Sequence, residues 1–314
     1  MNIQQLEYLV AVDTHRHFAR AAQSCFVTQA TLSMMIKKLE DELDLTVFDR
    51  SKQPVTPTDT GAQLIEQARI ILKEIARFKE MAQQSVHGLH GDLRIGIIPT
   101  LAPYLLPHFL PPFLASYPDI KLIISELTTD QITEKLAKDQ LDVGILATPL
   151  HKEGFQELSL FYEPFSVYVA NPESQALKKK YLLPEDLDLD HLWLLEEGHC
   201  LRTQIMNICE LQKQQSGKHA MEFGAGSIES LLKIVDINQG ITIIPELAAI
   251  DLPPRQKECL RSFKAPVPVR EISLVTYRHY VKKRVLEVLE QSIKNSLKPL
   301  ESHLQKKDKA IIEL

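Results

Sequence analysis

The stretch V-T-Q-A-T-L-S-M-M-I-K-K-L-E-D-E-L, residues 27–43, decides how the N-terminal part of the chain folds. Thr28 is a good helix N-cap, because its hydroxyl can accept a hydrogen bond from a free backbone N–H of the first turn. Apolar residues then recur every three or four positions and form one stripe along a helix. The stripe consists of Leu32, Met35, Ile36, Leu39 and Leu43. The stretch therefore predicts an amphipathic helix.

Two shorter helical patterns precede this helix. Residues 4–12 and 17–25 each carry apolar residues at helical spacing. A tight connection then leads into the third helix, and this succession is typical of a helix-turn-helix. The polar run D-R-S-K-Q-P at 49–54 lies between apolar residues and suits the turn of a β-wing. We predict a winged helix-turn-helix, mainly α, over residues 1–57.

A helix-turn-helix can present polar side chains to DNA. Gln, Ser and Thr can read base edges, and Lys and Arg can hold phosphates. Charge does not decide the matter, because residues 1–57 contain six Lys and Arg against seven Asp and Glu. An ordinary three-helix domain with a solvated polar face has the same pattern. The residues that we predict to contact DNA are Thr28, Gln29, Thr31, Ser33, Met34, Lys37, Arg50 and Lys52.

A long helical pattern begins at a second N-cap, Thr58, and runs to about residue 84. Its apolar residues are spaced 4-3-4-3-4, as in the seam of a coiled coil. They are Leu64, Ala68, Ile71, Ile75, Phe78 and Ala82. The stripe could pack on its own domain, but the polar outer faces favour a dimer through the same helix of a second chain. We interpret residues 58–90 as a dimerisation helix that ends in a hinge-like linker.

From residue 91 onward the pattern changes to short apolar runs that alternate with helical patterns. This alternation predicts an α/β domain with a mainly parallel sheet over residues 91–314. The runs expected to form strands are 93–98, 120–125, 143–146, 165–170, 192–195, 240–244 and 272–277. The expected helices are 104–116, 130–139, 201–212, 227–238 and 281–297.

The composition is that of an ordinary globular protein. A chain of 314 residues with 44% hydrophobic and 25% charged residues is ordinary for a globular protein of two or more domains. No apolar run is long enough to cross a bilayer, and the N-terminus lacks a secretory signal pattern, so we expect a cytoplasmic protein. The four cysteines are too few for a disulfide scaffold. We expect neither a metal ion nor another cofactor.

The chemistry is expected in residues 192–209, L-W-L-L-E-E-G-H-C-L-R-T-Q-I-M-N-I-C. Cys200 falls where a helix begins, with His199 just before it, and Cys209 lies on the apolar face of the same helix. A helix N-terminus lowers the pKa of a cysteine placed there. We hypothesise that the two thiols form a redox switch. Nine helical residues rise roughly 13 Å, and a disulfide needs Cα atoms within about 7 Å, so bonding must unwind the helix.

The chain resembles the LysR-type transcriptional regulators along nearly its whole length. The matching segments are L-E-Y-L-V at 6–10, A-R-A-A at 19–22, T-Q-A-T-L-S at 28–33, K-L-E-D-E-L at 38–43, V-F-D-R at 47–50 and P-T-D-T-G at 57–61. Ala30 departs from the proline that is usual in the family. Within the family the chain resembles the OxyR group of peroxide sensors through H-R-H-F at 15–18, I-P-T at 98–100, P-Y-L-L-P-H at 103–108 and G-H-C-L-R at 198–202.

The resemblance implies that Cys200 reacts with hydrogen peroxide and that Cys209 is its resolving partner. It implies that Thr100, Thr129, His199 and Arg278 surround the peroxide. It also implies a regulatory domain of two subdomains like those of periplasmic binding proteins, residues 91–165 with 269–300 and residues 166–268.

The implied partners are double-stranded promoter DNA, a thiol reductant system and RNA polymerase. The implied assembly is a homodimer or homotetramer that activates genes of oxidative stress.

Three other readings compete with a peroxide sensor. A LysR-type regulator could bind a small metabolite between its subdomains, with Thr100, Thr129 and Ser227 around an anion. A thiol peroxidase or Cys-His hydrolase would leave the helix-turn-helix unexplained, so we expect the chain not to be an enzyme. The absence of a signal pattern and the N-terminal helices argue against a periplasmic solute-binding protein.

Overall fold

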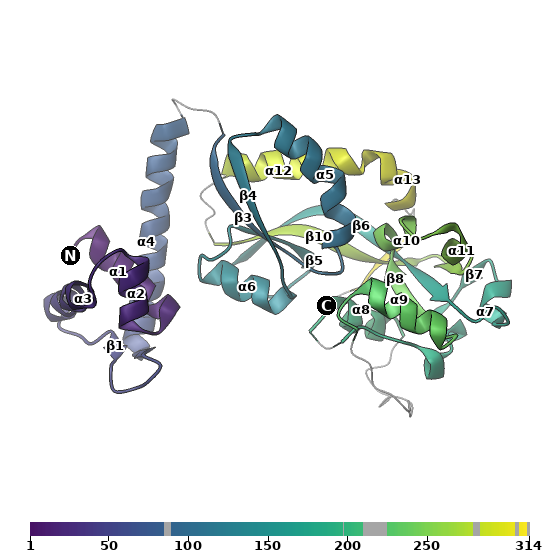
Figure 1. Ribbon diagram of the computed structural model, residues 1–314, viewed down its shortest axis with the longest axis horizontal. Helices are drawn as coiled ribbons and strands as arrows, with labels where there is room; N and C mark the ends of the chain where they lie inside the picture. The colour runs from purple at the N-terminus through teal and green to yellow at the C-terminus, as the bar shows by residue number, and fades with distance from the viewer. Residues whose placement is uncertain (85–88, 197, 210–224, 279–282, 305–307, 313–314) are drawn as a thin grey trace. The chain divides into compact units, whose positions relative to one another are not determined.

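The structure is a computed structural model that describes residues 1–84, 89–196, 198–209, 225–278, 283–304 and 308–312. The chain divides into two compact units (Figure 1), residues 1–88 with 279–283 and residues 89–278 with 284–314. In the described part of the chain, no helix is both long enough and apolar enough to span a membrane.

The first unit is a winged helix-turn-helix, as predicted. Its helices are α1 (Ile3–His15), α2 (Phe18–Ser24) and α3 (Gln29–Leu43), followed by the antiparallel strands β1 (Phe48–Asp49) and β2 (Thr56–Pro57) of the wing. The Thr28 hydroxyl caps α3 by accepting the Thr31 N–H at 3.2 Å. Leu32, Ile36 and Leu39 of the predicted stripe are fully buried. The cap and the stripe thus fix where α3 begins and which face it buries.

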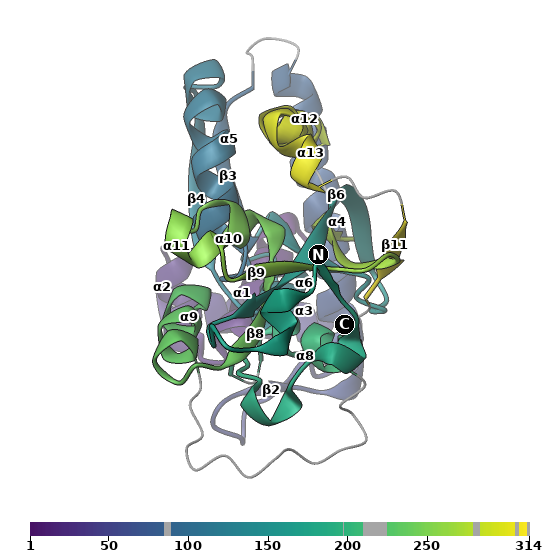
Figure 2. The same cartoon turned by 90° about the vertical axis from the view of Figure 1, so that its right-hand side faces the viewer.

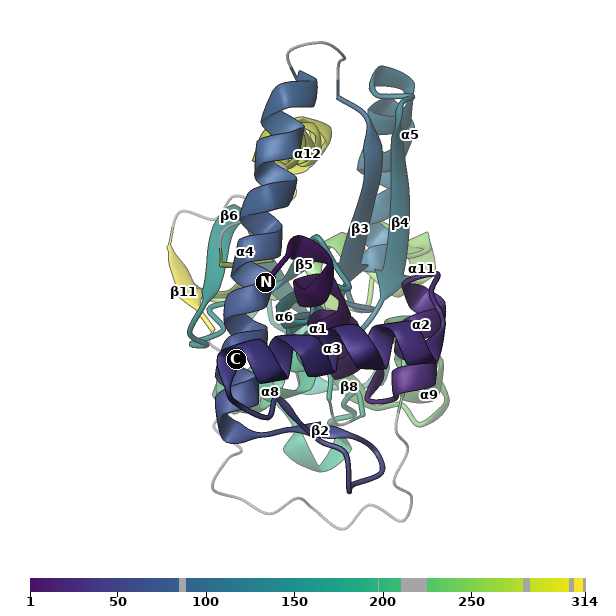
Figure 3. The same cartoon turned by 90° about the vertical axis from the view of Figure 1, so that its left-hand side faces the viewer.

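The long helix α4 (Asp59–Gln84) packs its first half against this unit. Figure 3 shows α1, α2 and α3, in purple, at the level of that half of α4, and α1 packs directly against it. The Thr58 hydroxyl accepts the Gly61 N–H at 2.9 Å and starts the helix. An almost buried ion pair between Arg69 and Asp13, 2.8 Å long, joins α4 to α1. Helix α4 is therefore an integral part of the N-terminal unit.

This packing corrects part of the predicted dimer seam. Ala68 is buried, and Leu64 and Ile71 pack against the core of the same unit. Burial against its own domain, the alternative to a dimer, therefore accounts for the first half of the apolar stripe. In the second half, Ile75 is half-buried and Phe78 is 76% exposed. The side chain of Ala82 and the linker residues 85–88 lie outside the described residues.

Nine strands form one sheet in the described part of the second unit. They are β3 (Gly91–Ile97), β4 (Ile120–Glu126), β5 (Val143–Thr148), β6 (Phe155–Val169), β7 (Tyr181–Leu182), β8 (Ile241–Pro245), β9 (Leu260–Phe263), β10 (Val267–Tyr277) and β11 (Lys309–Ile311). The order is β4-β3-β5-β10-β6-β9-β7, with β11 beside β10 and β8 beside β6. This is the α/β fold predicted for this part of the chain.

The sheet is mixed, which corrects the expectation of a mainly parallel one. Strands β3, β4 and β5 are parallel, but β10 runs antiparallel to β5, and β6 runs antiparallel to β10, β8 and β9. The strand predicted at 192–195 is also wrong, because Leu192 and Leu195 form only isolated bridges. The remaining predicted strands lie within β3, β4, β5, β6, β8 and β10, allowing for one residue at an end.

The helices of this unit are α5 (Ala102–Ser116), α6 (Thr129–Ala137), α7 (Gln175–Lys178), α8 (Cys200–Ile208), α9 (Ile228–Ile237), α10 (Glu246–Ile250), α11 (Pro254–Lys257), α12 (Lys283–Leu297) and α13 (Glu301–Leu304). Helix α6 packs on one side of β3 and β5, and α5 and α12 lie on the other side (Figure 1). Gly96 and Gly144 allow α6 to approach, because a Cβ at either would meet Ile132 at 3.0 Å or less.

Replacing Gly61 by alanine should destabilise the N-terminal unit. The new Cβ would clash with the Val47 carbonyl oxygen, which is backbone and cannot rotate away. Overpacking lowers the free energy of unfolding by about 1–3 kcal/mol, and we expect a loss at the upper end of this range. Alanine stabilises a helix over glycine by only ~1 kcal/mol, so the net effect should be a loss of stability. Hydrogen exchange of the α3 amides in the whole chain measures the change. Gln63→Ala, at an exposed position nearby, is the control, and equal protection in the two variants would contradict the prediction.

Candidate functional site

Helix α8 begins at Cys200, as predicted, but Cys209 lies at its other end and not within it; residues 210–212 of the predicted helix lie outside the described residues. Cys200 is its first residue, His199 is the N-cap and Cys209 is the C-cap. Leu201, Ile205 and the other inward residues of α8 are buried, so the helix is held by its apolar face. All four cysteines of the chain are free thiols. Since nine helical residues rise roughly 13 Å, Cys200 and Cys209 cannot bond while α8 stays helical.

The pKa of Cys200 differs from the expectation. Burial raises the pKa of the Cys200 thiol, and this effect outweighs the groups that lower it. Those groups are the positive charge of Arg270, the side chain of Thr129, and the backbone N–H groups of Leu201 and Cys200 itself. The helix start does supply N–H donors, as predicted, but it does not leave a low pKa. Burial likewise raises the pKa of Cys209 to about 11.

Arg270 lies at the centre of the site. Its side chain is 0% exposed, and its Nη1 donates to Thr100 Oγ1 at 3.0 Å while Nη2 donates to the Thr100 carbonyl at 3.2 Å. Nε donates to Glu163 Oε2 at 2.9 Å. Glu163 is also 0% exposed, and its Oε1 accepts the Leu247 N–H at 2.9 Å. Burial raises the pKa of Glu163, and the Arg270 charge opposes that rise.

Thr129 faces the Cys200 thiol. It is the first residue of α6, and the helix cap is its neighbour Thr128. The Thr129 side chain lowers the pKa of Cys200. Its buried hydroxyl oxygen nevertheless has no well-formed hydrogen bond to any described residue. Apart from its contact with the Cys200 thiol, the buried hydroxyl is therefore available to a polar ligand, which would gain a bond there.

The other predicted site residues have different positions. His199 is buried, with Nε2 3.7 Å from Glu196 Oε1. The prediction for Arg278 is corrected. Its backbone N–H donates to the Gly154 carbonyl at 2.6 Å, and its guanidinium lies over the Tyr277 ring. Arg278 comes just after the end of β10, eight residues beyond Arg270, which in an extended chain is a separation of roughly 27 Å.

Two site residues were missed from the sequence, Arg270 and Glu163. They lie directly opposite each other on β10 and β6. The sequence does mark them, because each is a charged residue inside a mainly apolar run and a buried charge needs a partner. The runs are V-P-V-R-E-I at 267–272 and Y-E-P-F at 162–165. Ser227, considered for anion binding, caps α9 by accepting the Ser230 N–H.

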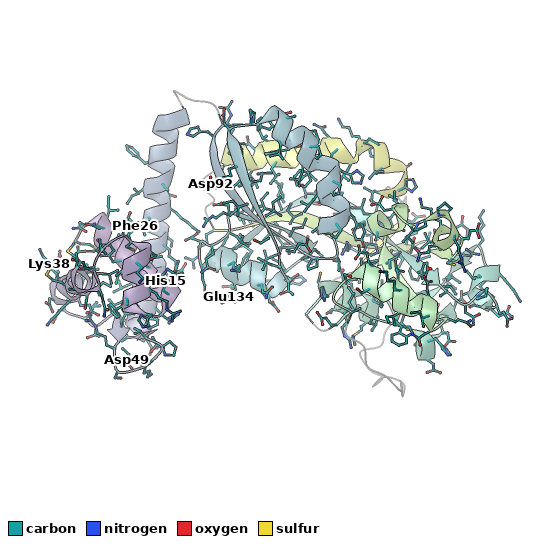
Figure 4. The ribbon with its side chains drawn as sticks, viewed as in Figure 1. His15, Phe26, Lys38, Asp49, Asp92 and Glu134 are labelled. Carbon is teal, nitrogen blue, oxygen red and sulfur yellow. The ribbon has the colours of Figure 1, made fainter. Side chains whose placement is uncertain are left out.

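The predicted DNA-contact residues divide into two groups. Gln29, Thr31, Met34 and Lys37 are exposed on α3, and Figure 4 shows the neighbouring Phe26 and Lys38 on the surface of this unit.

The other four bond within the fold. Thr28 caps α3, and Ser33 accepts from Arg50 Nη1 at 3.3 Å. Arg50 also pairs with Glu40 at 2.8 Å, and Lys52 pairs with Asp49 at 3.5 Å.

Comparison with known proteins identifies the family. Residues 3–62 match the bacterial regulatory helix-turn-helix proteins of the lysR family, and residues 87–298 match the LysR substrate binding domain. The chain belongs to the LysR family. It is therefore a DNA-binding transcriptional regulator and not an enzyme.

Individual relatives point to the OxyR group. The chain is 39% identical over 275 residues to a hydrogen peroxide-inducible genes activator of Dickeya chrysanthemi, covering 88% of this chain and 89% of that one. A full-length OxyR from Pseudomonas aeruginosa with cysteine replaced by aspartate superposes with a TM-score of 0.76 at 33% identity, covering 94% and 98%. A peroxide-bound cysteine-to-serine variant of Corynebacterium glutamicum OxyR gives 0.61 at 26% identity, covering 98% of each chain.

Removing the Arg270 charge should raise the pKa of Cys200 further and slow its alkylation at neutral pH. Each pKa unit lowers the thiolate fraction about tenfold. Arg270→Gln is combined with Glu163→Gln, so that no carboxylate stays buried without a partner. Arg278→Gln is the matched control and should leave the rate unchanged. Iodoacetamide labelling followed by peptide mass spectrometry measures the rate; equal slowing in both variants would contradict the placement of Arg270.

The raised pKa also predicts the pH dependence of Cys200. Because the folded thiol loses its proton only above its ordinary pKa, the alkylation rate should rise about tenfold per pH unit through neutral pH. The thiol of a short Cys200-containing peptide is exposed, so its alkylation rate should level off at a lower pH. Above that pH the rate for the folded chain should still rise. Stopped labelling between about pH 6 and pH 10 compares the two, and a plateau near neutral pH in the folded chain would show a thiolate instead.

Proposed function

We propose that this regulator senses hydrogen peroxide by oxidation of Cys200, forms a disulfide between Cys200 and Cys209, and thereby changes its DNA binding at oxidative-stress promoters. The observation that carries the proposal is that the Cys200 thiol lies within reach of the Arg270 charge and the Thr129 side chain, with Cys209 at the other end of the same helix. The names of the similar proteins, a peroxide-inducible genes activator and a peroxide-bound OxyR variant, support the same substrate.

The first step converts the thiol to a sulfenic acid. Cys200 loses its proton, and the thiolate attacks one oxygen of the peroxide; an S–O bond forms, the O–O bond breaks, and the departing hydroxide takes up a proton to become water. The Arg270 charge and the Leu201 N–H stabilise the thiolate. The Thr129 hydroxyl is free of other well-formed bonds and can donate to a peroxide oxygen.

The second step closes the disulfide. The Cys209 sulfur attacks the Cys200 sulfur, an S–S bond forms, the S–O bond breaks and a second water leaves, so that two thiols and one peroxide give one disulfide and two waters. Helix α8 must unwind for this, and Ile205 and Ile208 leave their buried positions. Each buried apolar side chain contributes about 1.5–3 kcal/mol, so unwinding needs the free energy that peroxide reduction supplies.

The remaining assignments follow from this proposal. Thr100, Thr129 and His199 surround the peroxide, with Arg270 in place of Arg278. Residues 1–57 bind promoter DNA through the predicted contact residues, residues 58–90 mediate dimerisation and residues 91–314 sense the redox state. Ile75 and Phe78 are the described apolar residues of the α4 stripe that remain accessible to a second chain.

The protein would act in the cytoplasm as a homodimer or homotetramer. A cellular thiol system would reset it, and RNA polymerase would read its state.

Peroxide should remove two titratable thiols from the chain and lower its mass by about two units, with the new bridge mapping to Cys200 and Cys209. Cys200→Ser should bind promoter DNA normally but give no peroxide-dependent change in its footprint. Cys259→Ser is the matched control and should keep both the bridge and the response. Footprinting and thiol mapping on one sample provide both readouts.

Two outcomes would count against the proposal. One is a bridge that contains Cys25 or Cys259, because α8 would then have no part in the switch. The other is an unchanged peroxide response in Cys200→Ser. A footprint that responds to a small anionic metabolite and not to peroxide would favour the alternative LysR-type sensor.

A further inference from the structure

The last described strand of the chain is bonded next to the redox site. Strand β11 pairs in parallel with β10, with Val267 opposite Lys309 and Val269 opposite Ile311. The Val267 N–H donates to the Asp308 carbonyl, and the Ile312 N–H donates to the Val269 carbonyl, both at 2.9 Å. Figure 2 shows β11 at the edge of the unit. These bonds end beside Arg270, the residue that follows Val269.

Gln204 connects this strand to α8. It lies one helical turn after Cys200, between the two cysteines, and its side chain is 0% exposed. Its Nε2 donates to the Ile312 carbonyl at 3.2 Å. Its Oε1 is buried and has no hydrogen-bond partner among the described residues. The bond to Ile312 therefore satisfies the Nε2 group of the buried Gln204 amide. Without it, both polar groups of the amide would be buried without a partner, which would add to the desolvation cost.

We propose that residues Asp308–Ile312 form a clamp that holds α8 helical in the dithiol state and is released when the disulfide forms. The inference rests on the proposed function, because it requires a Cys200–Cys209 bridge. Gln204 is attached to the backbone segment that must unwind, and a hydrogen bond of 3.2 Å does not survive a displacement of about 1 Å. Unwinding α8 thus breaks the contact between the helix and the C-terminal strand.

The clamp shifts the equilibrium between the dithiol and disulfide forms toward the dithiol form. A group that binds only one of two states shifts the equilibrium toward that state. The clamp binds the dithiol state, so it opposes oxidation. By linkage the effect is reciprocal, and disulfide formation weakens the hold of β11 on β10. The C-terminal strand then sets how strong an oxidising condition is needed to close the bridge.

The test compares two shortened chains. A chain that ends at Lys307 lacks the clamp. A chain that ends at Glu313 keeps the Ile312 carbonyl as a peptide carbonyl and is the matched control. The equilibrium constant for disulfide formation is measured in glutathione redox buffers by counting free thiols. It should rise about three- to tenfold in the chain ending at Lys307, as expected for the loss of one net hydrogen bond, and should equal that of the full chain in the control.

Hydrogen exchange on the full chain gives a second readout that does not depend on how well a shortened chain folds. The Ile312 and Val267 amides should exchange slowly in the dithiol form and faster in the disulfide form. Equal constants in the two shortened chains, or equal exchange in the two redox forms, would overturn the clamp while a normal bridge leaves the proposed function intact. If no chain forms the Cys200–Cys209 bridge, the proposed function fails and the clamp with it.

Discussion

The buried ion pair between Arg270 and Glu163 is the interaction on which the regulatory unit depends. Both side chains are fully buried and lie opposite each other on β10 and β6. Burying two charges costs several kcal/mol per ion, which their attraction repays only when the geometry is good and the remaining donors are satisfied. Here Thr100 and the Leu247 N–H complete the set. Apolar residues at these positions could stabilise the fold as well, so stability alone does not explain the pair.

What the pair adds is a fixed positive charge next to Cys200. A surface arginine would be screened by water, whereas a charge held in a buried site acts strongly at short range. The same burial raises the pKa of the thiol. The two effects oppose each other at Cys200: burial raises the pKa of the thiol, while the Arg270 charge and the neighbouring hydrogen-bond donors lower it.

Local signals in the sequence were enough to predict the N-terminal unit. The Thr58 and Thr28 caps and the α3 stripe are short-range features. The structure has both caps and buries Leu32, Ile36 and Leu39 of the stripe, but it leaves Leu43 at the end of the stripe exposed. The regulatory site was only half predictable. Cys200 and Cys209 are marked by their spacing, but Arg270 reaches the site through pairing with a strand more than a hundred residues earlier in the chain. Register across a mixed sheet depends on tertiary packing, which periodicity does not report.

The same limit explains the dimer seam and the C-terminal strand. A heptad pattern in α4 shows that one face is apolar, but it does not say which surface covers that face. The structure shows that Leu64 and Ile71 pack on the unit they belong to. Strand β11 is three residues long, too short to be found by its alternation.

The position of β11 beside β10 matters because it brings the Ile312 carbonyl to Gln204. Among the buried residues of α8 that the structure describes, Gln204 is the polar one, and the others are Leu201, Ile205 and Ile208. A helix held mainly by apolar contacts can unwind over a broad range of geometries. The bond from Gln204 to Ile312 is directed, so on the proposal made above it favours the helical form of α8 and with it the dithiol state.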